Sequence, residues 1–267
     1  MASVRRIYID RRLRTSGTGG DFTYDLPKRF EVPYQTIALV DCVLLPNVWG
    51  TIHDDNKRLY FSDWSGLNII SEQIYILPEG NYTGSQLAQL VEDTINATTI
   101  LTQVYSVSYD EKTGKFTISN PSGSFAIPTR DQLIALSNAG YTLGAQAIDK
   151  NDLKDCHDVI GFNSTANSVT GGVVVGEGYV DLIPYKCVFL CSGSIGNPGT
   201  VVGPVGQDTI IRRIPITAGF GNLIYDAHST AADYIDRSPT QLSEMHFRLT
   251  DERGRTIPLK GLSLIHI

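Results

Sequence analysis

Long apolar runs and cysteine are both scarce in this sequence. No stretch approaches the roughly 20 consecutive apolar residues that a membrane-crossing helix needs, and no apolar core of a secretion signal follows Met1. Of the four cysteines, Cys187 and Cys191 would lie about 13 Å apart in an extended strand, which is too far for a mutual disulfide. The sequence therefore predicts a chain without a membrane span, kept where thiols stay reduced.

Motifs that carry catalysis or metal binding are also missing. The sequence has no G-x-S-x-G nucleophile elbow and neither of the glycine-rich phosphate loops, G-x-x-x-x-G-K-[ST] and G-x-G-x-x-G. Cys156 and His157 are an adjacent pair of soft metal ligands, but no second pair follows at zinc spacing. Asp54-Asp55-Asn56 resembles a fragment of a calcium loop without its bidentate glutamate. We therefore expect neither an enzyme nor a cofactor nor a metal site.

Charge is sparse and unevenly distributed. Charged residues make up 19% of the chain and the net charge is −6, yet residues 1–30 hold seven basic residues against three acidic ones. The basic side chains at the start are those of Arg5, Arg6, Arg11, Arg12 and Arg14. Such a segment indicates either an arm that contacts DNA or an acidic partner, or a solvated edge strand whose arginines prevent edge-to-edge pairing.

Strand patterns dominate what is present. Residues 4–13 and 21–26 alternate between apolar and polar side chains, which is typical of half-buried strands. Residues 37–45 are almost continuously apolar and predict a central strand covered on both faces. Further strands are expected at residues 59–61, 68–77, 185–190, 209–216, 219–225 and 242–249.

A helix and a hairpin interrupt this series. Thr83 and Gln86 have the spacing of a capping box, so we expect a helix over residues 85–97. Its apolar stripe recurs at helical spacing through Leu87, Leu90, Val91 and Ile95. Strands at 104–109 and 115–119 flank a turn and complete a helix–hairpin insert over residues 80–119. A weaker pattern predicts a second helix over residues 130–139.

The end of the chain predicts a closing hairpin. Residues 246–251 form a strand pattern, Gly254 supplies the positive φ of a tight turn, and an apolar alternating run continues to Ile267. An apolar terminus of this kind is expected to be buried as a strand. In antiparallel sandwiches the strand near one chain end often neighbours the strand near the other.

These patterns predict an all-β fold, an antiparallel β-sandwich of jelly-roll type with a small helix-plus-hairpin insert. Immunoglobulin-like and barrel alternatives stay open. We expect a single domain over residues 1–267, with the insert at 80–119 and long surface loops at 140–178 and 193–206.

Aromatic residues suggest one candidate interface. Trp49, Tyr60 and Trp64 lie close in sequence, with Phe61 beside Tyr60. Clustered aromatic rings can form a platform for a sugar or for a protein partner. The competing interpretation is that these rings pack into the core.

Two short sets of strand and turn motifs carry a resemblance to a known family. They are Arg14-x-x-Gly17-Thr18-x-x-Asp21-Phe22-x-x-x-Leu26-Pro27 with Pro46-Asn47-x-Trp49-x-Thr51-Ile52 near the start, and Leu249-Thr250-Asp251-x-x-Gly254-x-x-Ile257-x-Leu259-x-Gly261 at the end. Between them lie Gly80-x-Tyr82-Thr83 and Tyr109-Asp110-x-x-Thr113-Gly114-Lys115-Phe116. This order resembles the vertex (penton-type) and minor capsid jelly-roll proteins of large double-stranded DNA viruses and Polinton-like elements.

The resemblance implies a structural protein of the virion, made in the host cytoplasm or nucleus. It implies a homopentamer at the five-fold vertices, with the major and minor capsid proteins as neighbours and with the basic N-terminal segment against DNA or an acidic partner. A minor or cement protein at another shell position and a glycan-binding attachment module are the alternatives. A hydrolase whose site lies on loops is a third.

Overall fold

The computed structural model describes residues 5–33, 36–65, 68–97, 104–121, 123–162, 167–170, 172–196, 201–203, 206–207, 209–227, 234–237 and 240–259. The chain forms two compact units. Unit 1 combines both ends of the sequence, Met1–Trp49 and Tyr185–Ile267, and unit 2 is the intervening Gly50–Pro184. Each unit has its own hydrophobic core, so each is described separately.

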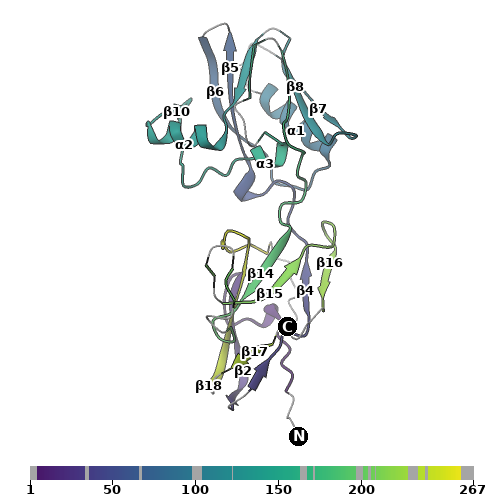
Figure 1. Cartoon of the computed structure of the whole chain (residues 1–267), viewed down its shortest axis with the longest axis vertical. Helices are drawn as coiled ribbons and strands as arrows, with labels where there is room; N and C mark the ends of the chain where they lie inside the picture. The colour runs from purple at the N-terminus through teal and green to yellow at the C-terminus, as the bar shows by residue number, and fades with distance from the viewer. Residues whose placement is uncertain are drawn as a thin grey trace. The chain divides into compact units, whose positions relative to one another are not determined.

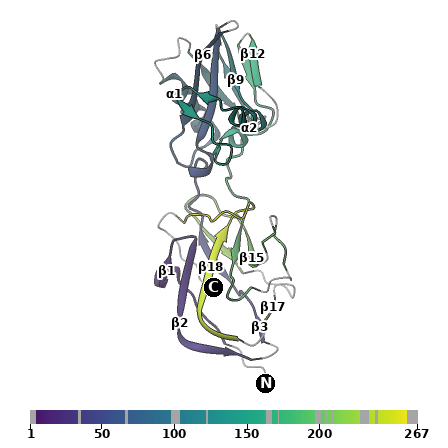
Figure 2. The same cartoon turned by 90° about the vertical axis from the view of Figure 1, so that its left-hand side faces the viewer.

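Unit 1 contains a five-stranded antiparallel sheet (Figure 1). Its order is β1-β2-β18-β14-β15, and the strands are β1 (Ser16–Gly17), β2 (Asp21–Val32), β18 (Thr240–Thr250), β14 (Cys187–Cys191) and β15 (Ile210–Pro215). The long strands β2 and β18 pair from Thr240↔Val32 to Arg248↔Asp21 and lie side by side in Figure 2. The expectation that strands from the two chain ends are neighbours is confirmed.

Two shorter strand pairs complete unit 1. In one, β4 (Val43–Pro46) pairs with β16 (Leu223–Asp226), and in the other β3 (Thr36–Ala38) pairs with β17 (Ile235–Arg237). Leu45 and Ile224 from the first pair lie in one buried cluster with Phe22, Val188 and Phe247 from the five-stranded sheet. Side chains from the two groups of strands therefore share one core, which makes unit 1 an antiparallel β-sandwich.

Two sequence expectations for unit 1 need correction. Residues 37–45 are not one strand covered on both faces: they split between β3 and β4, with Val40, Val43 and Leu45 buried and Ile37 and Leu39 exposed. Residues 4–13 do not form a strand either. The side chain of Asp10 accepts a hydrogen bond from the backbone N–H of Arg12 and caps a short 3-10 helix, η1 (Arg11–Leu13), so the local cap outweighs the alternating pattern.

The turn after β18 agrees with the sequence. Gly254 has φ +75°, and the N–H of Asp251 donates to the carbonyl of Arg255 across 3.0 Å. Ile257 and Leu259 are buried in the core of unit 1. The rest of the expected closing strand, residues 260–267, lies outside the described residues.

Unit 2 contains a four-stranded sheet, a three-stranded sheet and three α-helices. The first sheet has the order β12-β9-β5-β6 and the second the order β13-β8-β7. The strands are β5 (Arg58–Ser65), β6 (Asn68–Ile76), β7 (Ser106–Asp110), β8 (Lys115–Ser119), β9 (Ser124–Ile127), β12 (Asn167–Thr170) and β13 (Val173–Val175). The helices are α1 (Gly84–Asn96), α2 (Arg130–Asn138) and α3 (His157–Ile160), with a 3-10 turn, η2 (Asp54–Asn56), and a small pair β10 (Thr142–Leu143) and β11 (Gln146–Ala147).

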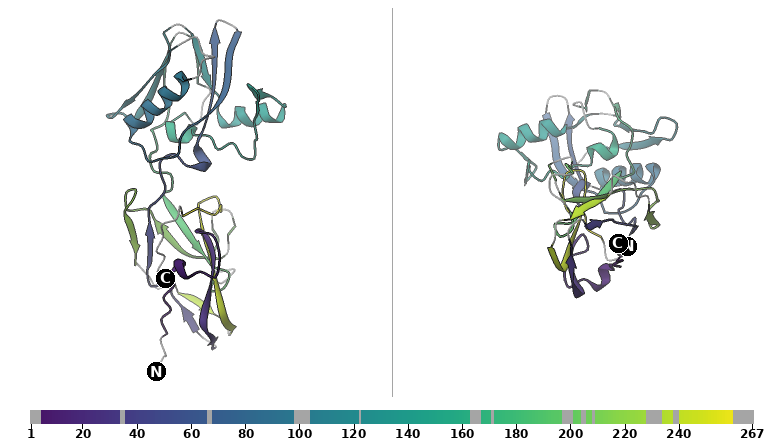
Figure 3. Two further views of the ribbon diagram at one scale, coloured as in Figure 1. Left: turned by 180° about the vertical axis from the view of Figure 1, so that it is seen from behind. Right: turned by 60° about the horizontal axis from the view of Figure 1, so that its bottom comes forward.

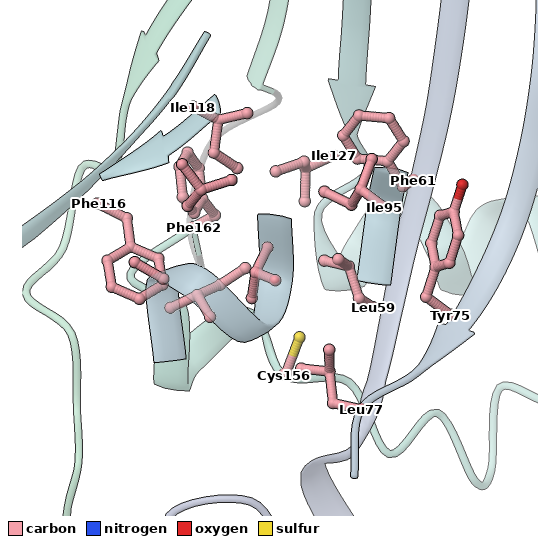
Figure 4. Close-up of a cluster of buried hydrophobic side chains, with 14 of the residues drawn as sticks. Leu59, Phe61, Tyr75, Leu77, Ile95, Phe116, Ile118, Ile127, Cys156 and Phe162 are labelled. Atoms are coloured by element: carbon pink, nitrogen blue, oxygen red, sulfur yellow. The ribbon is translucent and has the colours of Figure 1, made fainter. Parts of the chain in front are cut away.

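Helix α1 forms where the capping box predicts it. The Thr83 hydroxyl accepts from the N–H of Gln86 at 3.3 Å, and the Gln86 side chain accepts from the N–H of Thr83 at 3.0 Å. In its apolar stripe Leu87, Val91 and Ile95 are fully buried and Leu90 is half-buried. The stripe packs with side chains from β5 and β8, including Phe61 and Phe116 (Figure 4). The predicted hairpin is also present as β7 and β8, with Gly114 at φ +65° in the turn.

The insert is larger than the sequence predicted. The segment 80–119 belongs to unit 2, which begins at Gly50 and ends at Pro184. Residues 140–178, expected to be long surface loops, contain β10, β11, α3, β12 and β13, and they bury Leu143, Ile148, Leu153 and Phe162. Single apolar residues separated by polar turns produce no periodic pattern, so their burial could not be predicted from the sequence. In the other expected loop, 193–206, Ile195 is buried in the core of unit 1.

The fold class is as predicted from the sequence: all-β, with antiparallel sheets and few helices. Within the described part of the chain, no helix is long and apolar enough to cross a membrane.

Candidate functional site

The five N-terminal arginines have different environments. Arg11 is only 5% exposed, and its guanidinium lies against Gly19. Burial, followed by the neighbouring charge of Arg14, lowers the pKa of Arg11. Arg12 is exposed and donates from Nε to Oδ2 of Asp10 at 2.9 Å, and this hydrogen bond raises the pKa of Arg12. Arg11 is therefore a buried side chain, and the other four arginines face outward.

The outward members lie on an extended segment. Arg5 lies over the ring of Phe30 at 5.7 Å, and Arg14 donates to the carbonyl of Gly17 at 3.2 Å. Alternation places Ile7 and Ile9 toward the core, while Arg6 and Tyr8 are exposed. Tyr8 is 71% exposed and Leu13, in η1, is 66% exposed. The N-terminal segment, residues 5–14, thus presents cations together with two large apolar side chains.

The aromatic trio does not form a shared platform. Trp49 is buried in unit 1, where Nε1 donates to the carbonyl of Pro258 at 3.2 Å and the ring meets Tyr185 edge to face. Tyr60 is buried in unit 2, and its hydroxyl donates to the carbonyl of Leu153 at 2.7 Å. The side chain of Trp64 lies outside the described residues. The candidate aromatic interface is therefore wrong for Trp49 and Tyr60, which are core residues of two different units.

Buried ionisable groups gather in unit 2. His157 is almost fully buried against the ring of Tyr60, and Asp155 forms an ion pair with Arg130 at 3.2 Å. Burial lowers the pKa of His157 and raises the pKa of the Cys156 thiol. A neutral imidazole and a protonated thiol without solvent access suit packing rather than nucleophilic chemistry. Among the described residues, no three or more His, Cys, Asp or Glu side chains are arranged to hold a metal ion.

The Asp54-Asp55-Asn56 fragment, which resembled part of a calcium loop, takes part in ion pairs instead. Asp54 begins η2 and forms ion pairs with Lys57 at 2.7 Å and Lys154 at 2.6 Å. Hydrogen bonds from Lys154 and then Lys57 lower the pKa of Asp54 to about 2. The carboxylate is thus engaged by two ammonium groups and ties η2 to the segment before α3.

A hollow of about 450 Å³ opens on the outer side of β14. Its lining residues are Cys187, Phe189, Val202, Gly203, Arg213 and Glu252. The Cys187 thiol donates to Oε1 of Glu252 at 3.4 Å, and burial raises the pKa of Cys187. The thiol is therefore held protonated and lacks the features of an activated nucleophile.

The outer sides of β3, β4 and β16 expose large apolar side chains. The cross-strand pairs Tyr225↔Leu44 and Leu223↔Pro46 place these four side chains on the side opposite the buried Leu45 and Ile224. Tyr225 is 64% exposed and Leu223 54% exposed. We call this surface the β4–β16 face; its members are Ile37, Leu39, Leu44, Pro46, Leu223 and Tyr225. Figures 1 and 3 show β4 and β16 side by side along one side of the unit.

The turn before β16 extends this surface. Phe220 is exposed between Gly219 and Gly221, and Gly221 has φ +80°. The turn is held to the residue after β4, because the N–H of Gly221 donates to the carbonyl of Asn47 at 2.8 Å. An exposed phenylalanine on an anchored turn is suited to contact with a partner.

The opposite sheet of the sandwich has a polar outer side. Asp21 and Thr23 on β2 face His246 and Arg248 on β18, and the His246 ring lies 2.6 Å from Oδ1 of Asp21. One side of the sandwich thus carries charges typical of contact with water, while the β4–β16 face does not. This exposed apolar face was not predicted, because residues 37–45 were expected to form a strand buried on both sides. In the sequence, the available signal for this face was the pair of glycines on either side of Phe220.

Comparison with known proteins shows a likeness at the level of structure. No protein-family model and no curated protein matches the chain. Among solved structures, the chain is similar to the penton protein of mavirus, with a TM-score of 0.51 and 10% sequence identity, over 93% of this chain and 89% of that chain. At this identity the likeness shows the fold alone, and that fold is the one of a viral penton protein.

Proposed function

We propose that this chain is a structural protein of a virion, and that it assembles as a homopentamer at the five-fold vertices of an icosahedral shell. The observation that carries the proposal is the extent of the structural likeness. It covers 93% of this chain and 89% of the mavirus penton protein, so it includes residues of both units rather than the sandwich alone. A common sandwich module would account for unit 1 only.

The surface of unit 1 supports the same role. Five identical subunits around an axis meet through two different surfaces of each copy, and such contacts close into a ring when the rotation allows. The β4–β16 face offers a large apolar surface for one of these contacts. A two-sheet core shared by β2, β4, β14, β16 and β18 gives the subunit the stiffness that a shell wall requires.

The proposed location defines the remaining partners. A vertex subunit in the virion contacts the neighbouring major and minor capsid proteins, and the exposed arginines of the N-terminal segment supply a contact for an acidic partner. In this role the chain works by shape and surface, without catalysis.

The mass of the purified chain in solution tests the proposal. Light scattering coupled to gel filtration should give a particle of five times the 29.2 kDa subunit mass. A trimer would favour another shell position and overturn the vertex assignment. A monomer whose thermal stability rises in the presence of a glycan would favour an attachment module instead.

A further inference from the structure

We propose that the β4–β16 face of one copy docks on the outward side of the N-terminal segment of a second copy, head to tail. This inference rests on the proposed homopentamer and names the two surfaces that would form its contact. The two surfaces match in the side chains that each exposes and in the charges around them.

The β4–β16 face is apolar with an acidic border. Ile37, Leu39 and Asp41 are exposed at alternate positions, while Val40 and Val43 point into the core. Asp236 is the cross-strand partner of Ile37, so its side chain lies on the same side of the sheet. No lysine or arginine occurs in residues 36–49 or 216–227. The charges of these two segments are the exposed Asp41 and the buried Asp226, which is paired with Arg212.

The N-terminal segment has the opposite arrangement. Tyr8 and Leu13 are exposed, and Arg6 and Arg12 are the exposed cations beside them. Residues 5–14 contain five arginines and one aspartate. Buried Ile9 holds the segment on its own copy, so the exposed side chains are presented as a fixed surface.

These two surfaces are complementary both in their exposed apolar side chains and in their charge. Each has large apolar side chains whose exposure is above one half, and burial of such side chains against each other favours association. Carboxylates border one surface and guanidinium groups border the other, which favours encounter in a single orientation. Tyrosine and arginine are also the residue types most often found as binding hot spots. A second copy supplies both partners at equal concentration, and the contact is heterologous, as a ring requires.

Apolar and charge substitutions in the full-length chain test this contact. Tyr225→Ser with Leu223→Ser should weaken self-association by about tenfold or more. Asp41→Arg should weaken it through repulsion from Arg6, and Arg6→Glu should weaken it through repulsion from Asp41. The double variant Asp41→Arg with Arg6→Glu should recover most of the loss, because the charges are exchanged rather than removed. Dissociation measured by sedimentation over a concentration series gives the fold-changes.

Matched controls separate this contact from general damage to the fold. Tyr141→Ser and Val173→Ser change side chains of unit 2 that are similarly exposed, and they should leave association unchanged. Glu244→Arg reverses a charge on β18 outside both surfaces. Circular dichroism should show the same thermal transition for every variant.

The outcomes distinguish this inference from the proposed function. Loss in the single variants with recovery in the charge exchange supports the docking. If the wild type forms pentamers that none of these substitutions weakens, the docking is overturned and the proposed function stands. Loss in the Tyr225/Leu223 variant without recovery in the charge exchange shows a different occupant and also overturns the docking. A wild type that is monomeric at every concentration overturns both.

Discussion

Arg212 and Asp226 form a buried ion pair that joins the two layers of unit 1. Nε of Arg212 donates to Oδ2 of Asp226 at 2.7 Å, and Nη2 donates to Oδ1 at 3.2 Å. Arg212 is on β15 of the five-stranded sheet, and Asp226 ends β16. The pair fixes the strand that presents Leu223 and Tyr225 to the outside.

Removing one partner of this pair should destabilise unit 1. We expect Asp226→Asn to lower the free energy of unfolding by about 3–5 kcal/mol, because it removes the carboxylate charge that faces the buried guanidinium of Arg212. Replacement of both partners, by Arg212→Met with Asp226→Leu, should cost much less. Urea unfolding of the three variants measures the difference. Equal losses in the single and double variants would contradict an ion pair that acts as a unit.

Stability should fall on acidification because of His157. Burial, outweighing the charges of Asp155 and Asp158, lowers the pKa of His157 in the folded chain below its ordinary value of 6.5. As the pH falls below 6.5, the unfolded chain binds a proton that the folded chain does not, so the free energy of unfolding decreases. His157→Gln should flatten this dependence between pH 7 and pH 5. An unchanged slope in that variant would assign the effect to other groups.

The capping box of α1 should be worth a measurable part of the stability of unit 2. We expect Thr83→Ala to lower the free energy of unfolding by about 0.5–2 kcal/mol, since the N–H of Gln86 loses its acceptor. Thr83→Ser retains the hydroxyl and serves as the control. A loss of the same size in the serine variant would point to the methyl group rather than to the cap.

The N-terminal arginines should separate into two groups. Replacement of the exposed Arg5, Arg6, Arg12 and Arg14 by serine should reduce incorporation into particles while the thermal transition stays within a few degrees, because surface changes are usually within about 0.5 kcal/mol. Arg11→Ser should instead lower the unfolding temperature, because Arg11 is buried and packs against Gly19. Incorporation is measured by the protein content of purified particles. Unchanged incorporation in the fourfold variant would show that these arginines do not contact an acidic partner in the particle.

Local signals in the sequence were sufficient for much of the fold. Alternation identified β2 and β18, the T-x-x-Q spacing identified the start of α1, and Gly254 identified the turn after β18. The same spacing occurs at Thr129 and Gln132, where it starts α2 with both capping hydrogen bonds. That second box was present in the sequence and would have strengthened the weaker helix assignment.

Features that depend on distant parts of the chain were not predictable in this way. Which side chains of residues 37–45 are buried depends on what covers each face of these strands. β16 lies nearly 180 residues later in the sequence and pairs with an edge of β4 rather than covering a face. Trp49 and Tyr60 lie close in sequence but on opposite sides of the boundary between the two units. Periodicity reports that a residue is apolar and cannot report which core it enters.

The rotational symmetry of the purified assembly tests the vertex assignment most directly. Class averages of negatively stained particles of the full-length chain are expected to show rings with five-fold symmetry. Averages with three-fold symmetry, or a field of single subunits at every concentration tried, would contradict it.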